Sequence, residues 1–119
     1  MTRLRVFVIV LACCAGAACS DFGKVCTAEA RPGIRAVVRD SVTRAGLAAG
    51  TLAVAREGAF VDTLRGIDSL MSGVHERAGT YQVQVSRSGY HPWARNGVRV
   101  SEGECHVETA RVVVLLVPE

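Results

Sequence analysis

Residues 80–86 alternate apolar and polar side chains with a period of two residues. Tyr81, Val83 and Val85 share one face, and polar residues separate them. This alternation is typical of a half-buried strand in an antiparallel sheet. Most of the chain after Pro32 has the same design, with short apolar runs between turn residues and no convincing helical period. We therefore expect an all-β fold, a seven-stranded antiparallel β-sandwich.

The expected strands are bounded by glycine, proline and charged turn residues. The first follows Pro32-Gly33 and covers residues 34–40, and a hairpin over 51–65 turns at Glu57-Gly58. Residues 66–73 fit either a short strand or a single helical turn, and we expect a loop there. A turn over residues 89–93 precedes a strand that begins at residue 97. The final strand, 105–117, becomes apolar on both faces, as in a central strand, and stops at Pro118.

The first 18 residues have the three parts of a signal peptide. Residues 1–5 carry two arginines, residues 6–12 are apolar without interruption, and residues 13–18 are small. The apolar stretch falls short of the roughly 20 residues that span a bilayer, so a permanent membrane anchor is the weaker hypothesis. We expect residues 1–18 to direct export, 19–31 to form a tether and entry segment, and 32–118 to form one domain.

The end of this segment, Gly16-Ala17-Ala18-Cys19, resembles the lipobox of bacterial lipoproteins. The resemblance implies that Cys19 becomes the first residue of the mature protein and carries lipid chains that insert into the bilayer. The lipobox usually has Leu, Val or Ile where this chain has Gly16. Two alternatives stay open, namely lipidation at Cys13 and ordinary cleavage after Ala17 with no lipid. The lipoprotein hypothesis places the protein in the cell envelope, on the periplasmic or the outer-membrane face.

The cysteines support this interpretation by their number. The chain has five, of which Cys13 and Cys14 leave with the signal. If Cys19 is lipidated, Cys26 and Cys105 remain, and an even pair in a small exported domain predicts a disulfide. The bridge would close a loop of about 80 residues, which the loop-entropy model values at about 4–5 kcal/mol. Without a C-x-x-C motif, the same cysteines make a poor metal site.

Charge and motif content argue against several function classes. Beyond the first 18 residues, 12 basic and 11 acidic residues are interspersed, so the chain lacks the charge run typical of nucleic-acid binding. The histidines, His75, His91 and His106, are too far apart in sequence for the usual zinc-ligand spacing. The chain has no G-x-S-x-G motif and no phosphate-binding glycine loop. We expect no enzyme activity, no cofactor and no metal.

One turn has the composition of a binding surface. Residues 90–95 combine Tyr90, His91, Trp93 and Arg95 with a proline. Exposed aromatic rings beside an arginine could stack on a sugar or a peptide. The alternative, which we favour, is that Tyr90 and Trp93 pack over the open end of the core as the large rings nearest to it.

The order of these segments resembles the carboxypeptidase regulatory-like domain. Three segments carry the resemblance: residues 33–41, residues 78–85 with their G-x-Y-x-V-x-V pattern, and residues 88–93 with Gly89-Tyr90. The family implies a seven-stranded sandwich similar to transthyretin (prealbumin) and an accessory role without catalytic residues. We therefore expect a non-catalytic, membrane-anchored envelope module of structural or protein-interaction type, whose partner is an envelope protein. A carbohydrate or small-ligand module that binds a glycan through residues 90–95 is the alternative.

Overall fold

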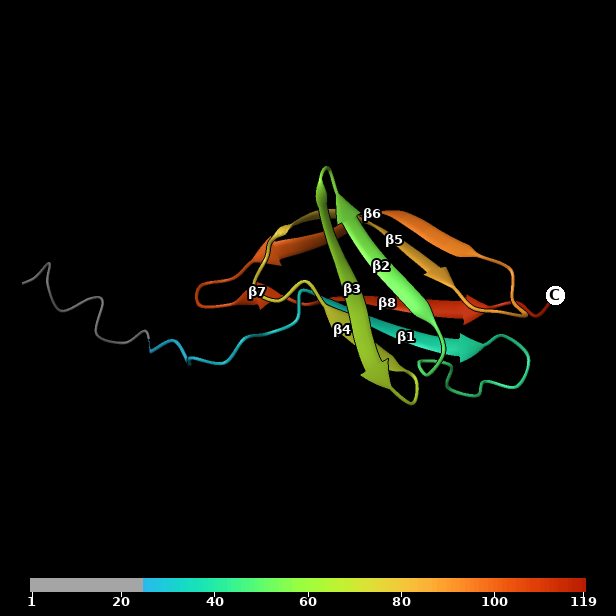
Figure 1. Cartoon of the computed structure of the whole chain (residues 1–119). Helices are drawn as coiled ribbons and strands as arrows, with labels where there is room; N and C mark the ends of the chain where they lie inside the picture. The colour runs from blue at the N-terminus through green and yellow to red at the C-terminus, as the bar shows by residue number, and fades with distance from the viewer. Residues whose placement is uncertain (1–24) are drawn as a thin grey trace, which may run out of the picture.

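The computed structural model describes residues 25–119 (Figure 1). The expected signal peptide and the candidate lipid sites Cys13 and Cys19 lie outside the described residues. The described part consists of strands and connections, without a helix. The eight strands are β1 (Ile34–Asp40), β2 (Leu52–Glu57), β3 (Phe60–Ile67), β4 (Leu70–Gly73), β5 (Gly79–Ser86), β6 (Trp93–Glu102), β7 (Val107–Glu108) and β8 (Ala110–Leu116).

All eight strands belong to one sheet in the order β7-β6-β5-β2-β3-β4-β1-β8. The sheet curls until β6 also approaches β8, so that it is mostly closed around a single interior. The expectation of an all-β fold is confirmed. Two details differ from the expectation: the described residues form eight strands, and the β1–β8 pair is parallel, with Ile34 opposite Ala110. A parallel pair is possible because the chain passes through all the other strands between β1 and β8.

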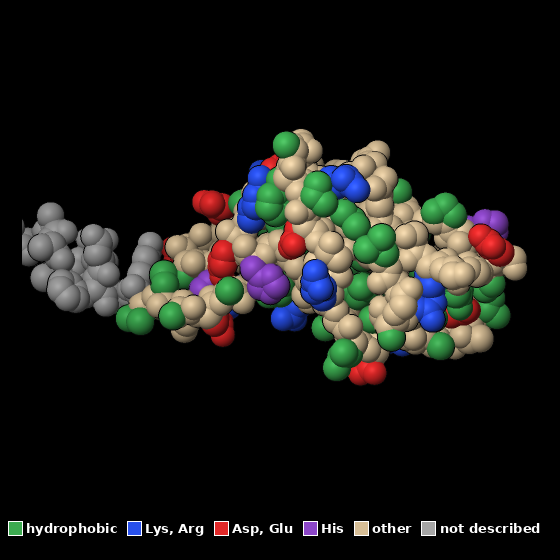
Figure 2. Space-filling view, viewed as in Figure 1, with side chains coloured by type: hydrophobic (Ala, Val, Ile, Leu, Met, Phe, Trp, Pro, Cys, Tyr) green, Lys and Arg blue, Asp and Glu red, His purple; other side chains and the backbone are tan. Residues whose placement is uncertain are grey.

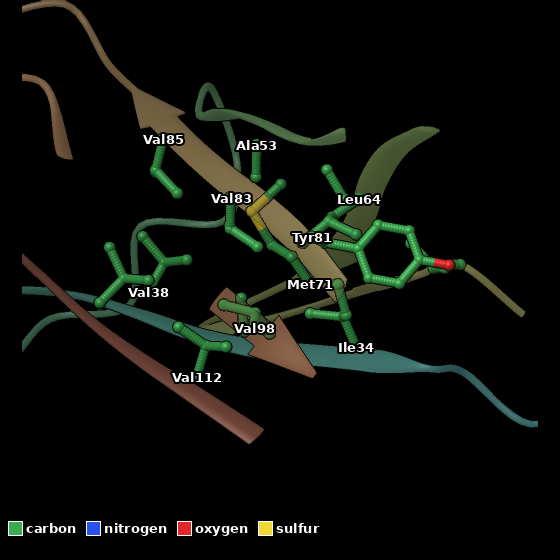
Figure 3. Close-up of a cluster of buried hydrophobic side chains, with 14 of the residues drawn as sticks. Ile34, Val38, Ala53, Leu64, Met71, Tyr81, Val83, Val85, Val98 and Val112 are labelled. Atoms are coloured by element: carbon green, nitrogen blue, oxygen red, sulfur yellow. The ribbon is translucent and has the colours of Figure 1, made fainter. Parts of the chain in front are cut away.

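The core consists mostly of aliphatic side chains. Ile34, Ala36 and Val38 of β1 are fully buried, and the alternation in β5 buries Tyr81 and Val83. In Figure 3 the side chains of β5 and those of β1 point toward a common interior. Tyr81 is the largest fully buried side chain, and its hydroxyl donates to the backbone oxygen of Arg77 at 2.8 Å. The period-two pattern thus identified the buried face correctly.

Two strand boundaries differ from the expected ones. Residues 66–73 are not a loop, because β3 continues to Ile67, turns at Asp68-Ser69 and returns as β4. Asp68 takes a positive φ of 56° at this tight turn, a conformation that aspartate tolerates better than most residues. The strand expected from residue 97 begins earlier, at Trp93.

The last segment also differs from its expectation. Cys105 and His106 lie in a bend before β7 rather than in a strand. The following β8 is the last strand in the sheet order, not a central one. Its outward Val113 is 48% exposed, so the apolar pattern on both faces of this strand marks an exposed apolar surface rather than burial.

The predicted Cys26–Cys105 disulfide is present, with the two Cα atoms 5.2 Å apart. It joins the segment before β1 to the bend before β7 and closes a loop with a sequence separation of 79. Within residues 25–119, the chain has no helix long and apolar enough to cross a membrane.

Candidate functional site

The Tyr90 side chain connects the predicted binding turn to the end of β1. Its hydroxyl donates to Oδ2 of Asp40 at 2.7 Å. Oδ1 of the same carboxylate accepts the backbone N–H groups of Val42 at 2.7 Å and Thr43 at 2.9 Å. Asp40 is the one buried charged residue in the described part of the chain. These hydrogen bonds hold the pKa of Asp40 below its ordinary value, and the bond from Tyr90 has the largest effect. The Asp40 carboxylate in turn raises the pKa of Tyr90.

The start of the turn also pairs with the segment after β8. Tyr90 forms an isolated antiparallel bridge with Pro118, and the His91 N–H donates to the carbonyl of Val117 at 2.9 Å. The Glu119 N–H donates to the carbonyl of Gly89 at 3.0 Å. Tyr90 is therefore a structural residue, since its ring packs on the core and its hydroxyl is already bonded.

Trp93 and Arg95 differ from Tyr90 in their surroundings. Trp93 is half-buried, with its ring packed against the core, and the Arg95 guanidinium carbon lies 5.2 Å from the centre of that ring. Pro92, Trp93 and Gln84 line a shallow depression there. His91 is exposed but forms no side-chain bond with other described residues. The predicted cluster therefore separates into a structural Tyr90 and a small accessible surface formed by Trp93 and Arg95.

A second polar cluster, which we call the N-terminal clasp, comprises Thr27, Arg31, Glu76 and His106. The Glu76 Oε1 atom lies 2.5 Å from His106 Nδ1 and accepts the Arg31 N–H at 2.8 Å. Glu76 Oε2 accepts the N–H of Val107 at 3.2 Å. His106 Nε2 lies 2.9 Å from the Thr27 hydroxyl oxygen, and the His106 side chain is only 10% exposed. The clasp lies beside the disulfide and attaches residues 26–31 to the domain.

The order hydroxyl–imidazole–carboxylate in this clasp is the order found in hydrolase triads. The imidazole lies between the other two groups, with Nδ1 facing the Glu76 carboxylate and Nε2 facing the Thr27 hydroxyl. The Glu76 carboxylate, however, receives three donors from two separate segments, residue 31 and residues 106–107, and the Arg31 N–H contributes most to the lowering of the Glu76 pKa. This sharing indicates a carboxylate that fixes chain segments together.

No local sequence pattern indicates Thr27 or Glu76 as site residues, because the clasp joins residues up to 79 positions apart. His106 was considered as a metal ligand, yet the structure places it beside a threonine and a glutamate. No group of three or more His, Cys, Asp or Glu side chains within residues 25–119 is arranged to hold a metal ion. The adjacency of Cys105 and His106 was the available signal, since a disulfide at Cys105 brings His106 to the N-terminal segment.

A third cluster supports the hairpin end of the core. The Arg77 guanidinium carbon lies 3.7 Å from the centre of the Phe60 ring, and Arg77 bonds Glu57 at 3.0 Å. Glu57 also accepts the N–H of Thr80 at 2.6 Å, which is the main cause of its lowered pKa. These contacts join β2, β3 and the start of β5.

No protein-family model matches the chain, and no curated protein matches it either.

Proposed function

We propose that this protein is a lipid-anchored, non-catalytic module of the bacterial cell envelope, of structural or protein-interaction type. The domain would be a transthyretin-like sandwich of the carboxypeptidase regulatory-like kind. The observation that carries the proposal is the Cys26–Cys105 disulfide. A disulfide in a small domain is typical of an exported protein, which agrees with the signal-like residues 1–18.

The pairing of Cys26 with Cys105 also bears on Cys19. Because the other two cysteines precede residue 18, Cys19 is the one cysteine beyond the signal-like segment that the disulfide does not use. An unpaired cysteine in an exported protein is reactive and uncommon. Lipidation at Cys19 would account for it.

The disulfide and the N-terminal clasp would also make the membrane tether short. Cys26 is bonded to the domain, and residues 27 and 31 are held by His106 and Glu76. The seven-residue step from Cys19 to Cys26 can span at most about 25 Å. The domain would work close to the bilayer surface.

A carbohydrate-binding function remains the second candidate, and the half-buried Trp93 ring beside Arg95 favours it. Tyr90 would not take part, because its hydroxyl is bonded to Asp40. Titration with envelope glycans, monitored by fluorescence of Trp93, tests this candidate, since Trp93 is the single tryptophan of the chain. A spectrum that does not change would eliminate it.

Membrane fractionation of a bacterium that expresses the full chain tests the main proposal. We expect the wild-type protein to be found in the membrane fraction and to dissolve only when detergent is added. The Cys19→Ala variant should lose the mature lipidated form, and Cys13→Ala, the matched control, should behave as the wild type. A Cys19→Ala variant processed and retained like the wild type would refute lipidation at Cys19.

A further inference from the structure

Three arginines that are far apart in the sequence form one row across the sheet. Arg65 of β3 is opposite Ser72 of β4, Ser72 is opposite Arg35 of β1, and Arg35 is opposite Arg111 of β8. The neighbours of these residues along each strand are mostly buried, so the row lies on the outer surface. We use the name arginine face for the outward side of β3, β4, β1 and β8 that carries this row and the outward residues next to it.

No acidic side chain of the described residues pairs with an arginine of this row. Within residues 25–119, Arg35, Arg65 and Arg111 form no ion pair and no side-chain hydrogen bond. Arg35 and Arg111 are directly opposite on strands about 4.8 Å apart, where like charges repel. The outward positions of these strands carry no acidic residue. The arrangement therefore costs stability unless an anion lies over it.

An apolar row runs alongside the arginines. This second row crosses the same four strands, and each of its members is two residues away from a member of the first row. Its members are Ile67, Leu70, Val37 and Val113. Ile67 is 76% exposed, Val113 48% and Leu70 42%. Figure 2 shows apolar side chains at the lower tip of the molecule, where Figure 1 places the β3–β4 turn.

The two rows meet in a groove. Its lining residues are Arg35, Arg39 and Arg111 with Val37, Leu70, Ser69 and Thr109, and it encloses about 500 Å³. The lining thus joins three cations to two aliphatic side chains and two hydroxyls, without a carboxylate.

We propose that the arginine face binds the surface of a membrane that contains anionic phospholipids. The phosphate groups would lie on Arg35, Arg65 and Arg111, and the apolar row would contact the lipid below the headgroups. The unpaired arginines indicate that the ligand is an anion. The exposed aliphatic row beside them indicates that this anion is a lipid and not a fully polar ligand. A single-stranded nucleic acid would require aromatic stacking, and the outward side chains of these strands include no aromatic ring.

This inference deepens the proposed function, because a tether of at most about 25 Å would keep the face near the bilayer. Its test is nevertheless independent of the anchor. The full chain with Cys19→Ser, which cannot be lipidated there, is sedimented with vesicles of phosphatidylcholine alone and with vesicles that also contain phosphatidylglycerol. The measured quantity is the ratio of binding to the anionic vesicles and to the neutral vesicles. The apolar residues 6–18 would bind both vesicle types, so their contribution does not change this ratio.

The parent chain is expected to prefer the anionic vesicles clearly. The double variant Arg35→Gln/Arg111→Gln should reduce this preference roughly 30-fold, because each arginine contributes about fivefold to the affinity for an anionic surface. Arg99→Gln, an exposed arginine of β6, is the matched control and should keep the preference. Leu70→Ser should weaken binding at constant charge. The double variant should melt at the same or a higher temperature than the parent chain, because it removes a repulsive pair.

Three results would overturn the inference. One is equal binding to both vesicle types, and another is an unchanged preference in Arg35→Gln/Arg111→Gln. The third is complete displacement by inorganic phosphate or poly-glutamate at the same concentration as the lipid headgroups, which would assign the face to free anions or to an acidic protein. None of these results depends on whether Cys19 carries a lipid, so the proposed function would stand or fall separately.

Discussion

The Tyr90 hydroxyl donates to the buried Asp40 carboxylate at 2.7 Å and thereby joins the connection after β5 to the end of β1. The same carboxylate closes the turn at Val42 and Thr43. One phenol thus connects two loops that are 50 residues apart. This bond is the reason why an apparently accessible aromatic turn is largely structural.

Tyr90→Phe is expected to lower the melting temperature by several degrees while the fold is kept, because Asp40 loses one of its three donors. The pKa of Asp40 should rise toward its ordinary value of 3.8, since Tyr90 is the largest cause of its lowering. An NMR titration of the Asp40 carboxyl checks this shift. Trp93→Phe is the matched aromatic control, and an Asp40 titration identical in Tyr90→Phe and wild type would contradict the assignment.

Replacement of both Cys26 and Cys105 by serine is expected to reduce the free energy of unfolding by about 4 kcal/mol, through the greater freedom of the unfolded chain. Denaturant unfolding of the variant and the oxidised wild type measures the difference. The N-terminal clasp should persist in the native state, because its bonds to Glu76 and His106 do not involve sulfur. A loss below about 1 kcal/mol would mean that the clasp alone holds residues 26–31 in place.

Stability should decrease in acid. Hydrogen bonds hold the pKa values of Asp40, Glu57 and Glu76 below their ordinary values of 3.8 and 4.5. A carboxyl with a lowered pKa stabilises the fold fully above its ordinary pKa, and this stabilisation is lost as the pH falls through the folded value. The free energy of unfolding should therefore fall as the pH drops below about 4.5. Denaturant melts over this range should show a weaker pH dependence in Glu76→Gln, and an unchanged slope would exclude Glu76 as a contributor.

Gly66→Ala should destabilise the protein by about 1–3 kcal/mol, because an added Cβ would overlap the backbone oxygen of Leu70 across the β3–β4 pair. Gly58→Ala is a contrasting variant: the space there is open, and its cost comes only from a φ of +55°. Thermal unfolding should rank Gly66→Ala as the less stable of the two. The opposite ranking would contradict the close approach of β3 and β4.

Much of the fold was predictable from local pattern. The alternation in β1 and β5 identified the buried faces, and parity identified the disulfide. The features that could not be predicted depend on how strands and loops that are far apart in the sequence align with one another. The N-terminal clasp needs Glu76 and His106 to meet across loops, and the arginine face needs the four strands β3, β4, β1 and β8 to align. Charges that are interspersed along the chain therefore do not reveal a row of charges across the sheet. The apolar end of β8 predicts a central strand, although β8 is last in the sheet order.

The mass of the mature N-terminus distinguishes a lipid-anchored protein from one that is cleaved without lipidation. The full chain is expressed in a bacterium, purified from membranes with detergent and analysed by intact and peptide mass spectrometry. We expect the mature protein to begin at Cys19 and to carry covalently attached acyl chains. A mature protein that begins with an unmodified Ala18 would contradict it.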